Sequence, residues 1–366
     1  MSFASLGERV SIGVKARVLY SRLLTADDYL MLLDSESVPQ ALEKLKSTAY
    51  GEFLVSLTSE SHRHEIEAAV KSTLIRHAEN FMLHLGNPRN RLFKAWFSLF
   101  EAENLKSVFR NLMAGRSSRD DLRRRLYPIT ATKISLEKLL LSKSFSDVAD
   151  TLRGTRFYKV LAEPLRRLAS GDDTSLFPAE MALDSFVESA IFKALGRFEP
   201  EERNVLLPIF GTRVDSYNLY SLYRAIVFYE LTPEETLNRL LPVRYRISLA
   251  MLREAVRFES FEVLASFIKE RLPAYAALLE GAENPEETQL VLERNFKRYI
   301  YIQARKVFSS GSPDFHTAMA YFILRNSEIA DITRVIECVR YGYDKRKAAA
   351  YLVMPVAFGG ESEWRY

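Results

Sequence analysis

Apolar residues recur along this chain at the three- and four-residue spacing of helices that bury one face. Phe93, Trp96, Phe97 and Phe100 show it most clearly and predict one buried helix face. Helix starts are marked at residues 232–235 and 284–287, where Thr or Asn precedes Pro-Glu-Glu, which gives an N-cap, a first-turn proline and an acidic first turn. The alternating pattern of strands joined by Asn-Gly or Asp-Gly turns is absent. The pattern therefore predicts an all-α fold.

The apolar pattern also repeats at long range. Segment 25–54 matches segment 132–161 without a gap, and each segment is typical of a helical hairpin. The second helix of each hairpin is predicted to begin at a capping box, Ser37-x-x-Gln40 or Ser144-x-x-Asp147. The identities 107 residues apart are Thr25/Thr132, Leu32/Leu139, Leu33/Leu140, Ser37/Ser144, Leu45/Leu152, Thr48/Thr155 and Leu54/Leu161.

A third copy of the hairpin is weaker. Segment 247–249 (Ile-Ser-Leu) matches 134–136 at an offset of 113, whereas 260–261 (Ser-Phe) matches 144–145 at an offset of 116. Three residues are therefore inserted between its two helices. Val263 stands where the second copy has Asp147, so we expect its capping box to be degraded.

The second half of each copy carries a further motif. Asn104-Leu105-x4-Arg110 and Asn218-Leu219-x4-Arg224 lie 114 residues apart, and Asp331-Ile332 occupies the corresponding place in the third copy. An Asn and an Arg six apart on a helix are turned by about 240° from each other, so they cannot form one ligand cluster. We expect these residues to be structural anchors between helices: Asn104, Arg110, Asn218 and Arg224.

Turn residues cluster at 114–118, 169–173 and 309–313, and none of these stretches is long enough to be a flexible interdomain linker. We therefore expect one continuous module of three helical pseudo-repeats, at residues 1–120, 121–236 and 237–366, with pseudo-threefold symmetry.

The composition, 48% apolar over 366 residues, suffices for a large core. No apolar run approaches the roughly 20 residues of a membrane span, and the first residues lack the pattern of a secretory signal. A cytoplasmic chain that works beside a membrane, if at one at all, is the expectation. The single cysteine, Cys338, excludes an intramolecular disulfide and a cage of several thiolates around zinc, and we expect it to be a small buried residue.

The charge distribution is uneven, although the net charge is only +4. Seven basic residues lie between Lys106 and Arg125, against only Asp120 and Asp121. This stretch is open to three interpretations: a solvated face, a docking site for an acidic partner surface, or a site for nucleic-acid phosphates. A single aromatic residue, Phe109, is too little for base stacking. The candidate partner contacts are Arg116, Arg119, Arg123, Arg124 and Arg125.

Catalytic and metal-binding patterns are missing. The sequence contains neither the G-x-x-x-x-G-K-[ST] phosphate loop nor a G-x-S-x-G elbow. His62 and His64 would be turned about 200° apart on a helix, and His77 and His84 would lie about 10 Å apart along its axis. We therefore expect no catalytic residue, no cofactor, no metal and no small-molecule substrate.

Several weak motifs follow one another from about residue 15 to residue 345. They are Asp28-Tyr29-x-x-Leu32, Thr48-Ala49-Tyr50-Gly51, Glu103-Asn104-Leu105-Lys106, Gly211-x-x-x-Asp215-x-x-Asn218-Leu219-x4-Arg224, and Glu328-x-x-Asp331-Ile332 leading to Glu337-Cys338. In this order and spacing they resemble the family of the C subunit of V-type and A-type rotary ATPases, which is called the d subunit in eukaryotes. Two features depart from the family pattern: Asp331 stands where the family favours Asn, and the stretch from Ala348 onward matches no family motif.

The resemblance implies a funnel of helices that sits on the cytoplasmic mouth of the membrane rotor ring and receives the foot of the central shaft. It implies a non-catalytic central-stalk piece that transmits torque for proton or sodium transport, with the shaft and ring subunits as partners and no nucleic acid. The alternative is a generic α-helical repeat scaffold in another assembly. An enzyme or a nucleic-acid binder, the third possibility, would show a deep polar pocket or salt-sensitive DNA binding.

Overall fold

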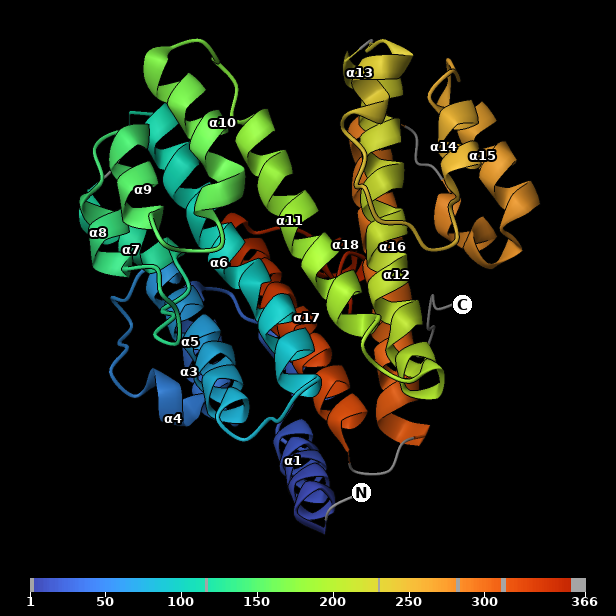
Figure 1. Cartoon of the computed structure of the whole chain (residues 1–366). Helices are drawn as coiled ribbons and strands as arrows, with labels where there is room; N and C mark the ends of the chain where they lie inside the picture. The colour runs from blue at the N-terminus through green and yellow to red at the C-terminus, as the bar shows by residue number, and fades with distance from the viewer. Residues whose placement is uncertain (1–2, 116–117, 230, 281–283, 311–313, 357–366) are drawn as a thin grey trace. The chain divides into compact units, whose positions relative to one another are not determined.

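The computed structural model describes residues 3–115, 118–229, 231–280, 284–310 and 314–356, and every regular element within these ranges is a helix (Figure 1). The prediction of an all-α fold is confirmed. Contacts divide the chain into two compact units, one formed by Met1–Ala49 with Phe198–Tyr366 and the other by Tyr50–Arg197. The division into three copies and the funnel stay predictions.

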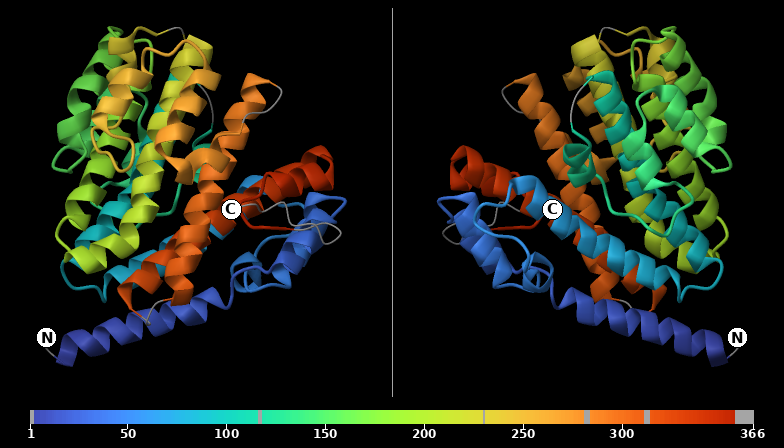
Figure 2. Two further views of the ribbon diagram at one scale, coloured as in Figure 1. Left: turned by 90° about the vertical axis from the view of Figure 1, so that its right-hand side faces the viewer. Right: turned by 90° about the vertical axis from the view of Figure 1, so that its left-hand side faces the viewer.

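The larger unit is built around the long helix α17 (Phe315–Tyr341), which packs against α1 (Phe3–Tyr20) and α16 (Pro285–Ser310) (Figure 2). α17 also contacts the first hairpin, α2 (Ala26–Leu33) and α3 (Val38–Lys46), while α16 packs against α12 (Pro200–Arg224). The remaining elements are the π-helix η1 (Ala225–Tyr229), α13 (Pro233–Leu237), α14 (Leu249–Ala255), α15 (Phe261–Arg271), the 3-10 helix η2 (Pro273–Leu279) and α18 (Lys345–Ala350).

The smaller unit has α6 (Arg89–Met113) at its centre. α6 packs along α11 (Phe177–Leu195), as Figure 1 shows, and α11 is covered by α10 (Tyr158–Ser170). Phe93, Trp96, Phe97 and Phe100 are all buried on α6, as their spacing predicts. The other helices are α4 (Gly51–Leu54), α5 (Arg63–Met82), α7 (Arg119–Arg125), α8 (Leu136–Leu141) and α9 (Phe145–Leu152).

The predicted hairpins are present as α2–α3, α8–α9 and α14–α15. Ser144 and Asp147 form the complete capping box. Ser37 caps α3, but the Gln40 side chain accepts from the backbone of Glu36 instead of closing the box on Ser37. Ser260 still caps α15 through the amide of Val263, so the third cap lacks only its reciprocal half.

Cys338 corrects one expectation. The thiol is half-buried rather than buried, and it lines a cavity of about 530 Å³ beside Leu290 and Tyr341. The apolar run around Cys338 predicted burial, but the residue faces the cavity that α16 and α18 line near the end of α17.

Candidate functional site

A hydrogen-bonded junction is centred on Asn104 of α6. The Asn104 side chain donates from Nδ2 to the carbonyl of Tyr127 (2.8 Å) and accepts at Oδ1 from the amide of the same residue (2.7 Å). Asn104 is only 5% exposed, so this two-way pairing satisfies an amide that water could not reach. It fixes the linker that leads from α7 to α8.

Asn218 of α12 holds the corresponding linker of the larger unit. Its Oδ1 accepts from the amide of Leu241 at 2.8 Å, across the same separation of 23 residues. Among the described residues its Nδ2 has no hydrogen-bond partner. Asn218 therefore holds its linker with one hydrogen bond, whereas Asn104 makes two.

Asp331 of α17 occupies the third position and clamps the end of the described chain. Oδ1 accepts from the amide of Val353 (2.9 Å) and Oδ2 from that of Met354 (2.7 Å), while Arg334 donates to Oδ1 at 2.8 Å. A carboxylate suits this site because both backbone groups are donors, whereas Asn104 faces one donor and one acceptor. The departure from Asn thus has a physical reason.

The C-terminal stretch is the third of three equivalent linkers. Each anchored linker reads apolar-Pro-β-branched: Tyr127-Pro128-Ile129, Leu241-Pro242-Val243 and Met354-Pro355-Val356. The anchored amides are those of Tyr127, Leu241 and Met354, spaced by 114 and then 113 residues. Sequence reasoning missed this relation, although the recurring proline at the repeat offset was the signal.

A buried acid lies one helical turn before each anchor. Glu101 accepts from the Thr132 hydroxyl and is paired with Arg156. Asp215 accepts from the amide of Arg246 at 2.9 Å and from the hydroxyl of Tyr275 at 2.8 Å. Each acid thus holds the residues that lead into the hairpin after its own helix.

Glu328 is the third acid, and it holds the first hairpin. It accepts from the amide of Leu24 at 2.6 Å, just before α2, and is paired with Arg325 at 2.8 Å. One turn of α17 therefore fixes both the N-terminal hairpin and the C-terminal linker, whereas α6 and α12 each fix one continuous segment.

Burial has an electrostatic cost at these acids. It raises the pKa of Asp215 above its usual range, although backbone amides and Tyr275 oppose the shift. Burial likewise raises the pKa of Asp331 against the amides of Val353 and Met354 and the charge of Arg334. Removal from water outweighs the hydrogen bonds at both carboxyls.

Arg110 and Arg224, the arginines of the two Asn–Arg motifs, pair with acids on neighbouring helices and not with the linkers that Asn104 and Asn218 hold. Arg110 bonds Glu180 of α11 at 2.8 Å, and Arg224 lies 3.9 Å from Glu293 of α16. Both pairs join one long helix to its neighbour, on a different side from the Asn contacts. Since Arg110 and Arg224 are exposed, these pairs contribute little to stability.

The predicted basic segment is split by the fold. Lys106 is buried; burial alone would lower its pKa, but Glu103 and Asp184 outweigh this and raise it. Arg119 and Arg123 of α7 share Glu137, at 2.5 and 2.7 Å. Arg124 approaches Glu65 at 3.8 Å, Arg125 bonds the carbonyl of Asp121 at 3.2 Å, and Arg116 lies outside the described residues. Most of the exposed arginines of this basic segment among the described residues therefore lie on α7.

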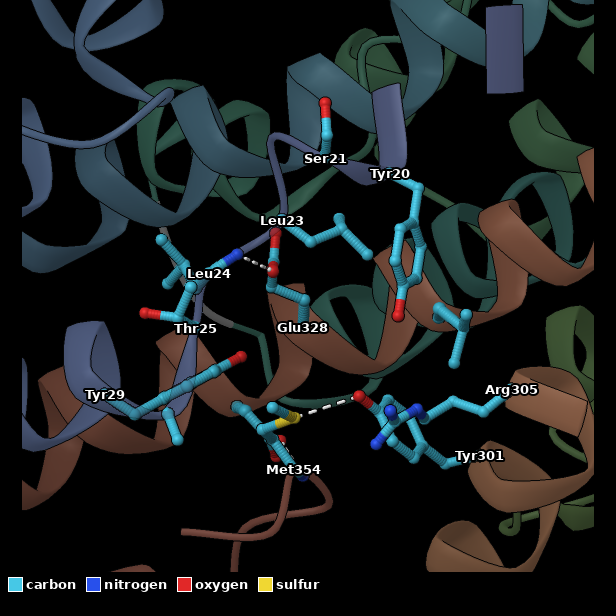
Figure 3. A pocket seen from close by; sticks show the side chains of 13 residues that line it. Tyr20, Ser21, Leu23, Leu24, Thr25, Tyr29, Tyr301, Arg305, Glu328 and Met354 are labelled. Atoms are coloured by element: carbon cyan, nitrogen blue, oxygen red, sulfur yellow. Dashed lines mark hydrogen bonds between the residues drawn. The ribbon is translucent and has the colours of Figure 1, made fainter. Parts of the chain in front are cut away.

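A cavity of about 350 Å³ opens where α17 holds the two chain segments. Tyr20, Tyr29 and Tyr301 surround it, and Leu24, Glu328 and Met354 lie at its wall (Figure 3). The hydroxyl of Tyr301 donates to the Met354 sulfur at 2.9 Å. At the α6 junction a space of about 10 Å³ lies beside Asn104, and a larger cavity of about 620 Å³ is lined by Phe97, Glu101 and Thr132. None of the described helices is both long and apolar enough to cross a membrane.

Comparison with known proteins gives the family. Residues 12–351 match the family described as ATP synthase (C/AC39) subunit. The chain is 21% identical to the C subunit of the A-type ATP synthase of Methanosarcina mazei over 325 residues, 88% of this chain and 86% of the relative. It is 22% identical to that of Pyrococcus horikoshii over 337 residues, 91% of this chain and 86% of the relative.

The family match covers the α6, α12 and α17 anchors and stops just after α18, before the anchored amides of Val353 and Met354. This family is a structural subunit of the synthase, so the prediction of a non-catalytic chain is confirmed by membership, and other subunits of the complex are its partners. The chain belongs to the ATP synthase (C/AC39) subunit family of the rotary ATPases.

Proposed function

We propose that this chain is the central-stalk coupling subunit of a rotary V/A-type ATPase, which links the rotor shaft to the membrane ring and transmits torque for ion transport. Its place would be peripheral, on the cytoplasmic face of the membrane. Family membership supports a role in this complex. The coupling role rests on how the helices are tied together.

The observation that carries the proposal is the set of buried clamps on α6, α12 and α17. A piece that passes torque must resist bending, and buried hydrogen bonds in a densely packed interior hold a protein in one arrangement. Asn104, Asn218 and Asp331 fix the linkers, and the acids one turn earlier fix the hairpins. Movement of a hairpin away from its long helix would break these buried hydrogen bonds. Each buried donor or acceptor left without a partner lowers the stability of the fold.

Assembly tests the proposal first. The tagged chain, mixed with purified shaft and ring subunits, is expected to recover both together, while shaft and ring without the chain remain separate. A linking role would be ruled out if the tagged chain recovered only one of the two partners, or if shaft and ring subunits bound each other equally well in a mixture without the chain.

The exposed arginines of α7 are the proposed contact with an acidic partner surface. The double variant Arg119→Glu/Arg123→Glu is expected to weaken binding to one of the two partners and to reduce its salt dependence. Arg153→Glu/Arg166→Glu, at two exposed and locally paired arginines of the same unit, is the control. Equal losses in both double variants would show that α7 has no special role.

A further inference from the structure

The cavity of about 620 Å³ in the smaller unit opens at the surface beside α6. It is lined by α6 and by segments 130–134 and 154–157, which lead into α8 and α10. Buried apolar side chains form its floor, and exposed residues form its rim. The floor is Met82, Phe97, Ile134 and Phe157, and the rim includes Lys94, Ala131, Lys133, Gly154 and Arg156.

This cavity is not a missing core side chain. At the α12 junction a Cβ on Gly211 would lie 2.2 Å from the Cγ of Tyr245, so the loop supplies the ring and the helix makes room for it. The α6 positions 114 residues earlier are Phe97 and Ala131, so here the helix supplies the ring and the loop residue is small. Because Phe97 is 2% exposed, the core is closed beneath it, and the cavity remains on the surface side with the exposed Ala131 at its rim.

Positive charge gathers around the cavity. Lys94, Lys133 and Arg156 line it, against Glu101 as the one acid among the described residues of its wall. Arg156 is paired with Glu101, and its Cζ lies 5.2 Å from the ring centroid of Phe157, so its guanidinium is held in place. Within the part of the chain that the structure describes, Lys94 and Lys133 have no ion-pair partner. Like charges that line one cavity repel each other, and an anion between them would relieve the repulsion.

The repeated fold does not require this set of charges. At the positions of Lys94, Lys133 and Arg156, the copy that surrounds α17 has uncharged residues. They are Tyr321, Ala26 and Ala49, at offsets of 227, 107 and 107 residues. In the α12 copy Pro208 stands at the position of Lys94, and Arg246, the counterpart of Lys133, lies over aromatic rings. The three cations around one cavity are therefore particular to the α6 copy, which favours a binding role over a structural one.

The donors that remain around the cavity favour carboxylates over a phosphate. Three threonine hydroxyls and two backbone amides of its wall already donate to acceptors within the chain. They are the hydroxyls of Thr130, Thr132 and Thr155 and the amides of Thr130 and Ala131. A phosphate is typically cradled by such short, fixed donors. Long lysine side chains can instead follow separate carboxylates, and the apolar floor suits an apolar side chain between them.

We propose that this cavity is the docking site of an acidic segment of a shaft or ring subunit. Carboxylates of that segment lie against Lys94 and Lys133, and an apolar side chain between them covers the floor. The inference rests on the proposed place of the chain between shaft and ring. The arginines of α7 do not line the cavity, so this contact is separate from the one proposed for α7.

The affinities of the purified shaft and ring subunits for the full-length chain, measured one subunit at a time, test this docking site. Lys94→Glu/Lys133→Glu is expected to weaken the binding of one subunit by about tenfold or more. Lys138→Glu/Lys159→Glu makes the same change of charge at two exposed lysines of the same unit that do not line the cavity, and wild-type affinity is expected. Ala131→Tyr fills the cavity with the residue type of position 245 and keeps every charge; it is expected to weaken the same subunit while melting like the wild type.

The outcomes separate this inference from the proposed function. Wild-type affinity in both Lys94→Glu/Lys133→Glu and Ala131→Tyr would overturn the docking site and leave the linking role intact. Displacement of the bound subunit by inorganic phosphate, but not by chloride at the same ionic strength, would overturn the choice of carboxylates. A wild-type chain that binds neither subunit would overturn both proposals.

Discussion

The carboxylate of Asp331 accepts a hydrogen bond from the amide of Met354 at 2.7 Å, 23 residues further along the chain. The same separation joins Asn104 to Tyr127 and Asn218 to Leu241. This recurring contact identifies the C-terminal segment as a structural linker, in the place that the other linkers hold within the chain.

Exchanging the anchor types should destabilise the chain in both directions. Asp331→Asn turns an amide donor toward one of two backbone donors, and Asn104→Asp replaces the donor to the Tyr127 carbonyl by a buried charge. We expect each to lower the free energy of unfolding by about 1–3 kcal/mol, measured by urea denaturation. If Asp331→Asn left the free energy of unfolding unchanged, the hydrogen bonds from the amides of Val353 and Met354 would not explain why a carboxylate occupies this position.

The pKa of Asp215 predicts a pH dependence. Because burial raises it above the value of an unfolded chain, the folded state binds the proton more tightly, and the stability owed to this carboxyl falls as pH rises through the raised pKa. The loss caused by Asp215→Asn should therefore be larger at pH 4.5 than at pH 7.5. Urea denaturation of both proteins at the two pH values gives the difference, in which the other titrating groups cancel. A loss that grows toward pH 7.5 would mean that the pKa is lowered.

Two leucines of α8 form a matched pair for the repeat periodicity. Leu139 is 2% exposed and Leu141 is 59% exposed, two residues apart in one helix. Leu139→Asp buries an unpaired charge and should lower the free energy of unfolding by about 4 kcal/mol, whereas Leu141→Asp should change it by less than about 0.5 kcal/mol. Thermal melts of the two variants decide this, and similar melting temperatures would show that α8 does not face the core as the repeat implies.

Gly211 tests the close approach of Tyr245. An alanine there would place its Cβ 2.2 Å from the ring, so Gly211→Ala should cost about 1–3 kcal/mol. Adding Tyr245→Ala should recover part of this loss by removing the clash. Gly196→Ala, whose nearest neighbours are backbone oxygens 3.5 Å away or more, is the control and should be tolerated. A tolerated Gly211→Ala would indicate that the ring can move aside.

Local signals predicted the helices and missed the junctions. Caps such as Ser144-x-x-Asp147 and the apolar spacing on α6 depend on residues within one or two turns, so they can be read along the chain. The acids Glu101, Asp215 and Glu328 instead bond a hydroxyl or backbone amides of distant segments, and a backbone amide has no sequence signature. The Asn and Asp anchors were found only because the repeat brought them into register.

For the basic stretch from Lys106 to Arg125, the sequence shows the number of charges but not which of them are buried. Lys106 and Arg119 are close in sequence, but Lys106 is buried with Asp184 while Arg119 lies at the surface with Glu137. Only a tertiary structure separates a buried ion pair from a surface patch. The arginines of α7 and Arg110 of α6 are the described basic residues of that stretch that lie exposed or partly exposed.

We propose that this chain couples rotation to ion transport. The most direct measurement is the number of ions transported per ATP hydrolysed, in membranes that carry the complex with and without the chain. We predict that ATP hydrolysis continues without the chain while ATP-driven ion transport is lost, and that adding the chain back restores the ratio. Unchanged ion transport per ATP in its absence would contradict the account.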